Sequence, residues 1–295
     1  MLLDGKYLSN IIYENISEEI NSLKTKNIIP KIAIILIGSN KESMVYVNMK
    51  LKKCTSLGIL HNLINLEEDV SIDNVLKNIN ELNNDENIHG IMVQLPLPEH
   101  LKSSKQIICD TIDPKKDVDG LTSYSFGRLS TYGKIDLKNL NKIDFFISST
   151  VYGVLKFIDF YNINIKGKKV GIIGNSTLLG IPLSIILSTN ESTVEIFNKE
   201  SGSLENQLLD KDIIISCTGV KHLVKEHMVK YGVTIIDIGI FVEFYDGKKT
   251  IYGDCDFENL KNKSSFITPV PGGVGPMTIC SLVEQTIKSA KSISI

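Results

Sequence analysis

The stretch VGIIGNSTLLGIP, residues 170–182, decides the fold of this chain. It begins with apolar, β-branched residues of the kind found in buried strands, and Gly174 follows them directly. After a short polar turn, Gly180 and Pro182 open an apolar helix. Glycine lets the backbone approach a phosphate closely, and the helix N-terminus supplies unpaired N–H groups. The stretch is therefore typical of a dinucleotide-binding turn, although its glycine spacing is not G-x-G-x-x-G and a plain strand-to-helix turn would show the same pattern.

Strands and helices alternate on both sides of this stretch. Predicted strands cover 168–174, 192–197, 212–217 and 233–240, and predicted helices cover 151–161 and 181–188. Because these strands are rich in Val and Ile and alternate with helices, they are typical of a parallel sheet covered on both faces. Residues 148–269 are therefore predicted to form a Rossmann-like domain.

The N-terminal half shows a similar alternation. Helices are predicted over 7–23, around Lys50 and over 71–82, strands over 31–38 and 88–95, and loops and short turns over 110–148. The last predicted helix, 277–291, carries an apolar stripe that must dock on another element: Ile279, Leu282, Val283 and Ile287. The fold class is therefore α/β with two domains, residues 1–147 and 148–269, and residues 270–295 are expected to return to the first domain.

The composition argues against several functional classes. Hydrophobic residues make up 42% and charged residues 22% of the 295 residues, as in soluble globular proteins. The net charge of −2 gives no electrostatic reason to expect nucleic acid or a membrane as a partner. Five scattered cysteines predict neither a disulfide framework nor a metal site and suit a reducing cytoplasm. The N-terminus lacks the apolar region of a secretory signal, and the strongest apolar run is too short to span a bilayer.

One lysine stands apart in the helix that contains SMVYVNMKLKKC, residues 43–54. The stripe predicted to face the core consists of Met44, Val47, Leu51 and Cys54. Lys52 and Lys53 lie about 120° to 140° from this stripe and are expected in water, whereas Lys50 lies only about 60° from it, one turn after Tyr46. Desolvation would lower the pKa of Lys50 and make it available as a base. A lysine whose stem packs while its ammonium reaches water has the same spacing, so both interpretations stay open.

Further polar residues at strand ends are candidate ligand contacts. Gln94 ends an apolar strand, where it could hydrogen-bond a ligand or simply cap the strand. DPKKDVDGL, 113–121, has three aspartates whose spacing does not favour a metal, and a solvated acidic loop is the alternative. Lys199 follows the predicted strand 192–197, where it could attract the 2′-phosphate of NADP or be a surface charge. PVPGGVGP, 269–276, requires an unusual backbone path of the kind found where a ligand approaches closely.

Taken together, these segments resemble the bifunctional methylenetetrahydrofolate dehydrogenase/methenyltetrahydrofolate cyclohydrolase family. The resemblance covers nearly the whole chain, in the family's order, through YVNMKLKKC (46–54), GIMVQLPLP (90–98), DPKKDVDGL (113–121), GNSTLLGIP (174–182), IIDIGI (235–240) and ITPVPGGVGPMT (267–278). It implies a folate-binding catalytic domain completed by the C-terminal helix, a Rossmann-like NAD(P)-binding domain, and a cytoplasmic homodimer. It also implies oxidation of 5,10-methylenetetrahydrofolate to the methenyl form with NADP (NAD being possible) and hydrolysis to 10-formyltetrahydrofolate in one-carbon metabolism.

The resemblance implies roles for individual residues and involves no metal. By position, Lys50 is the catalytic lysine that serves as base or proton relay for the attacking water, and Gln94 assists it. Tyr46 stacks on the folate ring system and Asp119 binds the pterin edge, which completes the catalytic group. Further substrate contacts are implied for Gly272, Gly273 and Val274, and cofactor contacts for Gly174, Asn175, Ser176, Lys199 and Ile240.

The chain departs from the family pattern in its cofactor half. Ser148, Ser149, Thr150 and Val151 replace Pro-Cys-Thr-Pro, which is expected to loosen a loop next to the cofactor. Asn175 replaces a common arginine, Asn198 and Lys199 replace His-Ser, and Phe241 replaces an asparagine. Coenzyme choice and dehydrogenase efficiency therefore stay open. The alternatives are a cyclohydrolase with an impaired dehydrogenase and a non-catalytic folate- or nucleotide-binding relative.

Overall fold

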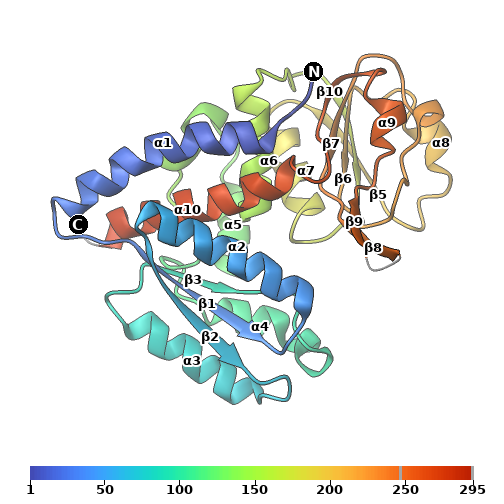
Figure 1. The fold of residues 1–295 in the computed structure, drawn as a ribbon. Coiled ribbons are helices and arrows are strands. Elements are labelled where there is room, and N and C mark those ends of the chain that lie inside the picture. The colour runs from blue at the N-terminus through green and yellow to red at the C-terminus, as the bar shows by residue number, and fades with distance from the viewer. Residues whose placement is uncertain (246–247, 294–295) are drawn as a thin grey trace. The chain divides into compact units, whose positions relative to one another are not determined.

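The computed structural model describes residues 1–245 and 248–293, which form two compact units (Figure 1). Unit 1 consists of Met1–Asn10, Tyr132–Leu140 and Thr150–Thr278, and unit 2 consists of Ile11–Thr131, Asn141–Ser149 and Ile279–Ile295. The first helix, α1 (Gly5–Lys24), and the last, α10 (Val274–Ile293), each contribute residues to both units. The domain boundaries expected from the sequence stay a prediction.

Unit 2 contains a parallel sheet of three strands in the order β2 (Leu60–Leu66), β1 (Lys31–Ile37) and β3 (Gly90–Val93). The central strand is buried on both faces, since Ile32 and Ile34 belong to one core cluster and Ala33 and Ile35 to another. Figure 1 shows α2 (Lys41–Leu57) and α3 (Ile72–Asn84) on opposite sides of this sheet. A strand covered on both faces explains why KIAIILI is apolar at every position after its lysine.

The apolar stripe of α10 docks on the core of unit 2. Leu282, Val283 and Ile287 are each at most 2% exposed and lie in the cluster that contains Ile32 and Val47. Full burial of such a side chain stabilises the fold by ~1.5–3 kcal/mol. The predicted docking face of the last helix is therefore confirmed.

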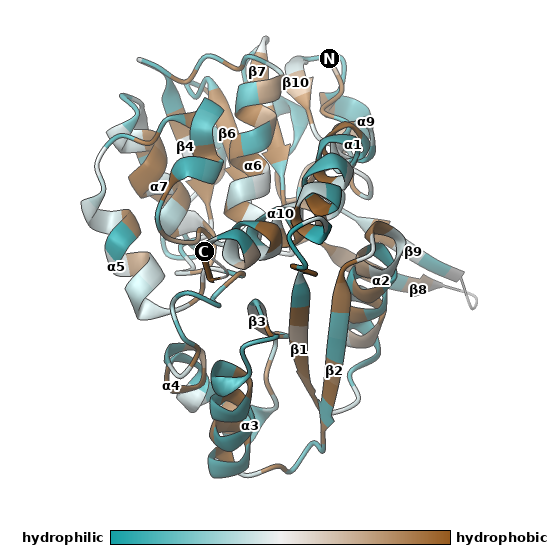
Figure 2. Ribbon diagram, turned by 90° about the vertical axis from the view of Figure 1, so that its left-hand side faces the viewer, coloured by the Kyte–Doolittle hydropathy of each residue, from teal (hydrophilic) through white to brown (hydrophobic). Residues whose placement is uncertain are grey.

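Unit 1 contains a parallel sheet of five strands, which confirms the predicted Rossmann-like sheet. The order is β10 (Ser264–Ile267), β7 (Val233–Asp237), β6 (Ile213–Ser216), β4 (Lys169–Ile173) and β5 (Thr193–Phe197). Figure 2 shows the hydrophobic colouring of its central strands, and Figure 1 shows α6 (Ser149–Phe160) and α7 (Gly180–Thr189) on one side, with α8 (Leu204–Gln207) and α9 (Phe257–Leu260) on the other. The direction in which successive strands are added to the sheet reverses at β4, because β5 pairs with one side of β4 and β6 with the other. Open α/β sheets bind ligands at the carboxyl ends of the strands beside such a reversal.

Several elements were not predicted from the sequence. The strand β2, LHNLINL, lies at a sheet edge with largely exposed polar residues, so it lacks the continuous apolar run of its neighbours. β10 pairs with β7 at the other sheet's edge, and β8 (Phe241–Tyr245) pairs with β9 (Lys248–Tyr252) in an antiparallel hairpin. Short helices complete the chain: α4 (Lys105–Asp110) and the 3₁₀ turns Glu99–Ser104, Leu137–Lys142 and Glu226–Met228.

The expectation of loops and short turns over 110–148 was wrong in one place. Residues Ser123–Thr131 form the helix α5, although their sequence, SYSFGRLST, is poor in strong helix formers. The buried Asp117 carboxylate accepts hydrogen bonds from the backbone N–H of Thr122 and from the Ser125 hydroxyl (3.0 and 2.7 Å). A tertiary contact, rather than helix propensity, therefore supports the start of α5.

None of the helices in the described part of the chain has both the length and the apolar character needed to cross a bilayer.

Candidate active site

Lys50 lies in the buried face of α2, in unit 2. The helix begins after Asn40, whose side chain accepts a hydrogen bond from the Ser43 N–H, and it ends at Gly58 in the left-handed conformation. Lys50 is only 6% exposed, and its Nζ donates to Gln94 Oε1 at 2.9 Å and lies 3.4 Å from Met92 Sδ. The alternative in which Lys50 extends its ammonium into water is therefore wrong.

The surroundings of Lys50 favour its neutral form. Burial lowers the pKa of the Lys50 ammonium below its usual range, while Asp119 and Cys54 oppose this shift. A lysine held in this way sits closer to the protonation state that a general base requires.

The two lysines that follow Lys50 in α2 differ from each other. Lys52 is exposed as predicted, but Lys53 is only half-exposed, and its Nζ lies 4.1 Å above the centre of the Tyr13 ring. The expectation that Lys53 is simply solvated was wrong, because a cation over an aromatic face gains electrostatic attraction without an opposite charge.

Gln94 is fixed in the orientation that serves Lys50. It follows β3, and its backbone N–H donates to Ile35 O at 2.9 Å. Its Nε2 donates to Leu95 O at 2.6 Å, so its Oε1 is left to accept from Lys50. A side-chain amide held at both ends cannot flip without losing one of these bonds, so Gln94 does more than cap the strand.

Asp119 is the anionic counterpart of Lys50. Burial raises the pKa of its carboxyl, while Lys50 and hydrogen bonds from the side chain and backbone of Ser149 lower it. Tyr46, one turn before Lys50 on α2, is half-buried, and burial followed by the charge of Glu42 raises its pKa. The structure therefore joins Lys50 to Gln94 by a hydrogen bond and places Asp119 where its charge acts on the pKa of Lys50, with Tyr46 beside Lys50 on the same helix.

The rest of DPKKDVDGL is structural, and the alternative of a solvated acidic loop was wrong. Asp117 is 1% exposed, and burial raises its pKa to about 6. The Lys116 ammonium is buried and donates to three carbonyl oxygens at the C-terminus of α3, on Leu82, Asn83 and Asp85 (3.1, 2.8 and 2.8 Å). This cation adds hydrogen bonds to carbonyls at the C-terminal end of the helix, where the helix dipole favours a positive charge. Among the described residues, no three His, Cys, Asp or Glu side chains are grouped to hold a metal ion.

In unit 1, the turn after β4 is shaped by two glycines. Gly174 has a φ of 116°, and a Cβ at this position would lie 2.7 Å from Cys217 Sγ. A Cβ on Gly180 would lie 1.9 Å from the Gly174 carbonyl oxygen. Glycine is therefore required at both positions, because the start of α7 packs directly on the end of β4. Asn175 and Ser176 are exposed in the turn between them, and the Ser176 hydroxyl accepts from the Leu179 N–H at 3.2 Å.

The remaining cofactor candidates lie at the same carboxyl edge of the sheet. Lys199 follows β5 as a highly exposed cation, with Nζ 3.7 Å from the Glu200 carboxylate. Ile240 is 40% exposed, and its carbonyl oxygen lies 3.5 Å from the position that a Cβ on Gly219 would occupy. An exposed cation and open backbone are suited to a ligand that arrives from solvent.

Two buried aspartates that hold this edge together were not identified as site residues from the sequence. Asp254 accepts from the Thr218 N–H (2.7 Å), the Ser216 hydroxyl (2.6 Å) and the Val220 N–H (2.9 Å). Asp237 accepts from the N–H groups of Gly239 (2.9 Å), Asp254 (3.1 Å) and Cys255 (2.8 Å), and burial raises its pKa to about 7. The sequence placed Asp237 at a strand end, but it offered no signal for Asp254, which lies 36 residues from its partner Thr218.

The glycine-rich segment 271–275 is also in unit 1. Gly272 has a φ of 111°, and its carbonyl oxygen accepts from the Gly5 N–H at 2.9 Å. Gly273 donates to Pro269 O at 2.8 Å and, like Val274, is buried. A Cβ on Gly5 would lie 1.8 Å from Gly273 O, so this tight backbone path is matched by a glycine at the start of α1.

The segment that replaces the family's Pro-Cys-Thr-Pro is well packed. Ser148, Ser149 and Val151 are at most 9% exposed. The Ile147 N–H just before them donates to Gln285 Oε1 at 3.0 Å. Its expected effect on cofactor binding stays a prediction.

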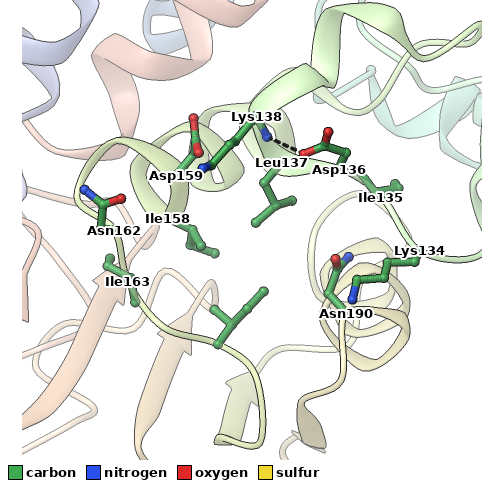
Figure 3. Close-up of a pocket in the computed structure, with 11 residues that line it drawn as sticks. Lys134, Ile135, Asp136, Leu137, Lys138, Ile158, Asp159, Asn162, Ile163 and Asn190 are labelled. Carbon is green, nitrogen blue, oxygen red and sulfur yellow. Dashed lines mark hydrogen bonds between the residues drawn. The ribbon is translucent and has the colours of Figure 1, made fainter.

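A separate cavity of about 610 Å³ opens in unit 1 (Figure 3). Its lining includes Ile163 and Ile165, which precede β4, and Asn190, which precedes β5, together with Lys134 and Asp136. It therefore lies at the amino ends of these strands, whereas parallel sheets bind their ligands at the carboxyl ends. None of the predicted site residues lines it.

These features define an α/β enzyme. One unit contains a buried lysine suited to acid–base catalysis, and in the other the carboxyl edge of the parallel sheet is suited to binding a nucleotide. Residues 3–119 match the family described as "Tetrahydrofolate dehydrogenase/cyclohydrolase, catalytic domain", and residues 148–294 match its "NAD(P)-binding domain". The chain belongs to the tetrahydrofolate dehydrogenase/cyclohydrolase family.

Full-length relatives agree with this assignment. The chain is 42% identical over 290 residues to the bifunctional protein FolD of Hydrogenobaculum sp., covering 98% of both chains. It is 40% identical to the crystal structure of the bifunctional enzyme FolD from Campylobacter jejuni, with a TM-score of 0.90 and 99% of both chains covered. It is 27% identical to the Trypanosoma brucei enzyme, solved in complex with NADP cofactor and inhibitor, with a TM-score of 0.91 and 99% and 97% covered. The relatives support the bifunctional interpretation, and they do not support the impaired or non-catalytic alternatives.

Proposed function

We propose that this chain oxidises 5,10-methylenetetrahydrofolate to 5,10-methenyltetrahydrofolate with NADP and hydrolyses the product to 10-formyltetrahydrofolate. The observation that carries the proposal is the buried Lys50 ammonium, which contacts Gln94 at 2.9 Å and faces the charge of Asp119. Burial of a lysine destabilises the fold, and titratable groups perturbed in this way cluster at functional sites. Family membership supplies the substrate class in which both reactions occur together.

In the hydrolytic step, Lys50 acts as the base or proton relay. As water attacks the methenyl carbon, a C–O bond forms and the water proton passes to Lys50 Nζ. The hydroxyl on that carbon then gives up its remaining proton as the C=O bond forms, the bond from the carbon to N5 breaks with its electron pair going to N5, N5 takes up a proton, and the formyl group stays on N10. Gln94 holds Nζ in place through its Oε1, while burial keeps the Lys50 pKa low enough for the neutral amine to be accessible.

The proposed substrate-binding roles of Asp119, Tyr46 and the segment 272–274 rest on the chemistry of each residue. The Asp119 carboxylate has two acceptor oxygens, which match the paired N–H donors of a pterin edge. The half-buried ring of Tyr46 supplies an aromatic face for a planar ring system. Gly272, Gly273 and Val274 are assigned as further substrate contacts on the family resemblance, and the backbone of this segment is tightly constrained.

The residues at the carboxyl edge of the five-stranded sheet fit a dinucleotide. Gly174 and Gly180 leave room for backbone approach, the open turn at Asn175 and Ser176 offers polar groups, and Ile240 borders the edge. The exposed Lys199 cation suits the 2′-phosphate of NADP better than the bare ribose of NAD. Bound NADP would accept the hydride that the first reaction removes.

One assay tests the proposal. The purified chain is given methylenetetrahydrofolate with NADP and, separately, with NAD, and methenyl formation and its later loss are followed. We expect methenyl formation with NADP, and hydrolysis of added methenyltetrahydrofolate without any coenzyme. No methenyl formation with either coenzyme would contradict the dehydrogenase, and hydrolysis at the spontaneous rate would contradict the cyclohydrolase.

We also propose that the chain forms a homodimer. In the described part of the chain, β8 and β9 pair only with each other, and Phe244 is 69% exposed on their surface. Unpaired strand edges beside an exposed aromatic side chain are suited to a second copy. We expect sedimentation velocity to show a dimer, and Phe244→Lys to shift it toward monomer. A monomeric parent chain would contradict this proposal.

A cytoplasmic location is part of the same proposal. All five cysteines are free thiols, as expected in a reducing compartment. Fractionation of the source cells tests it, and recovery outside the cytoplasmic fraction would contradict it.

A further inference from the structure

The segment that carries Asp119 packs tightly against the segment that ends at Ser149, within unit 2. Gly120 has a φ of 63°, and a Cβ at this position would lie 2.4 Å from the Ile147 carbonyl carbon and 2.6 Å from Ser148 N. Only glycine permits this approach. The position of Asp119 is therefore coupled to the position of the backbone at 147–149.

Gln285, on α10, joins these two segments. Its side chain is 1% exposed, and its Nε2 donates to Val118 O at 2.8 Å and to Ile147 O at 2.9 Å. Its Oε1 accepts from the Ile147 N–H at 3.0 Å. The amide hydrogen-bonds Val118, directly before Asp119, and Ile147, at the start of the 147–149 segment. It therefore fixes the position of the two backbones relative to each other.

Ser149 completes the arrangement at the carboxylate itself. Its side chain is 1% exposed, and its hydroxyl and its backbone N–H both hydrogen-bond the Asp119 carboxylate. Its Oγ also lies 3.5 Å from Val118 O. Burial raises the pKa of Asp119, and the charged group that lowers it is Lys50 on α2. Ser149 is therefore the hydrogen-bond donor on a carboxylate whose pKa is also lowered by the charge of Lys50.

We infer that Ser149 and Gln285 are positioning residues that hold the Asp119 carboxylate in the orientation that binds the pterin edge of the substrate. Ser149 acts by direct hydrogen bonds, and Gln285 acts through the backbone on both sides of the contact. Hydrogen bonds to a charged group are stronger than neutral ones, and they fix direction as well as charge. The inference rests on the proposed role of Asp119 in folate binding.

The experiment is a double-mutant cycle on Ser149 and Asp119. For each variant, KM and kcat for methylenetetrahydrofolate and the midpoint of thermal unfolding are measured. Ser149→Ala is expected to raise KM about tenfold while kcat and the thermal midpoint stay close to those of the parent. In an Asp119→Asn background, Ser149→Ala is expected to add no further rise in KM, because it acts only through the carboxylate.

Two variants at the same segment serve as controls. Ser148→Ala removes a hydroxyl from the adjacent buried position and is expected to leave KM unchanged. Ser149→Cys replaces the hydroxyl with a weaker donor of nearly the same shape, and its KM is expected to lie between those of the parent and Ser149→Ala. Gln285→Met removes all three amide hydrogen bonds, and it is expected to raise KM as well as lower the thermal midpoint.

The outcomes separate the inference from the function on which it rests. If Asp119→Asn keeps the parental KM, the proposed substrate contact of Asp119 is wrong. If Asp119→Asn raises KM but Ser149→Ala does not, the positioning role is overturned while the proposed function stands. Additive rises in KM, or an equal effect of Ser148→Ala, would also overturn the positioning role.

Discussion

The two candidate sites of this molecule are built in opposite ways. In unit 2, Lys50, Gln94 and Asp119 are side chains drawn from three separate segments; Lys50 donates to Gln94, and burial together with the charge of Asp119 acts on the Lys50 pKa. In unit 1, the edge of the sheet is made of glycines and open backbone, with the exposed cation of Lys199 beside it. Proton transfer needs a group whose pKa is shifted by burial, whereas a large anionic cofactor needs space and accessible donors. The contrast predicts that mutations in the two sites separate the two activities.

The strongest test of this contrast is Lys50→Met, which keeps the length of the side chain and removes the amine. We expect hydrolysis of methenyltetrahydrofolate to fall by about a thousandfold, the scale of general base catalysis. The free energy of unfolding should not fall, because a buried ammonium is replaced by an apolar group of similar size. Assays with added methenyltetrahydrofolate and urea unfolding curves measure the two quantities. Lys52→Met, on the exposed side of α2, is the matched control, and parental hydrolysis by Lys50→Met would remove Lys50 from the mechanism.

Gly174→Ala tests the other half of the comparison. A Cβ there meets Cys217 Sγ at 2.7 Å in a left-handed backbone conformation, so we expect a cost of ~1 kcal/mol or more. The KM for NADP should rise about tenfold or more, while hydrolysis of added methenyltetrahydrofolate keeps its parental rate. Gly167→Ala is the control for backbone strain alone, because Gly167 has a φ of 71° but nothing within 4 Å of its Cβ position. Equal loss of both activities in Gly174→Ala would show that the two sites do not separate.

The pH dependence of hydrolysis sharpens the role of burial at Lys50. In the proposed mechanism the neutral amine of Lys50 is the base, so the rate should rise about tenfold per pH unit up to the Lys50 pKa and then level off. Because burial lowers that pKa, the plateau should begin below the usual range for lysine. Gln94→Glu places a carboxylate next to Nζ, which raises the Lys50 pKa and should move the rising limb to higher pH. Rates are corrected for spontaneous hydrolysis at each pH. If the pH–rate profile of Gln94→Glu rises over the same pH range as that of the parent, Lys50 is not the titrating group.

The smallest effect is expected for Lys199→Gln. The Lys199 side chain is exposed and near Glu200, so its attraction to a 2′-phosphate is screened by solvent. We expect the KM for NADP to rise about threefold and the KM for NAD to stay the same. Lys225→Gln changes another exposed lysine of unit 1 and should alter neither. If both KM values rise together in Lys199→Gln, this lysine does not discriminate between the coenzymes.

Local pattern was enough to predict most of the architecture. The apolar strands 31–37 and 233–237, and the glycine turn at 174–180, follow from periodicity and from the backbone freedom of glycine. The stripe on the last helix likewise predicted that it must dock. Among the elements that pattern missed are the edge strand β2, whose apolar residues are interrupted by His61, Asn62 and Asn65, and the helix α5, whose start is supported by Asp117.

The sequence by itself determined most of the buried strands and long helices, because burial on one or two faces leaves a regular spacing of apolar residues along the chain. Only the tertiary structure decided that Lys50 is buried rather than solvated and that its partner is Gln94, 44 residues away. It alone showed that Lys116 satisfies the end of α3, and that Gln285 joins Val118 to Ile147. The physical reason is that desolvation and hydrogen-bond geometry depend on neighbours that are distant in sequence, and no local spacing records them.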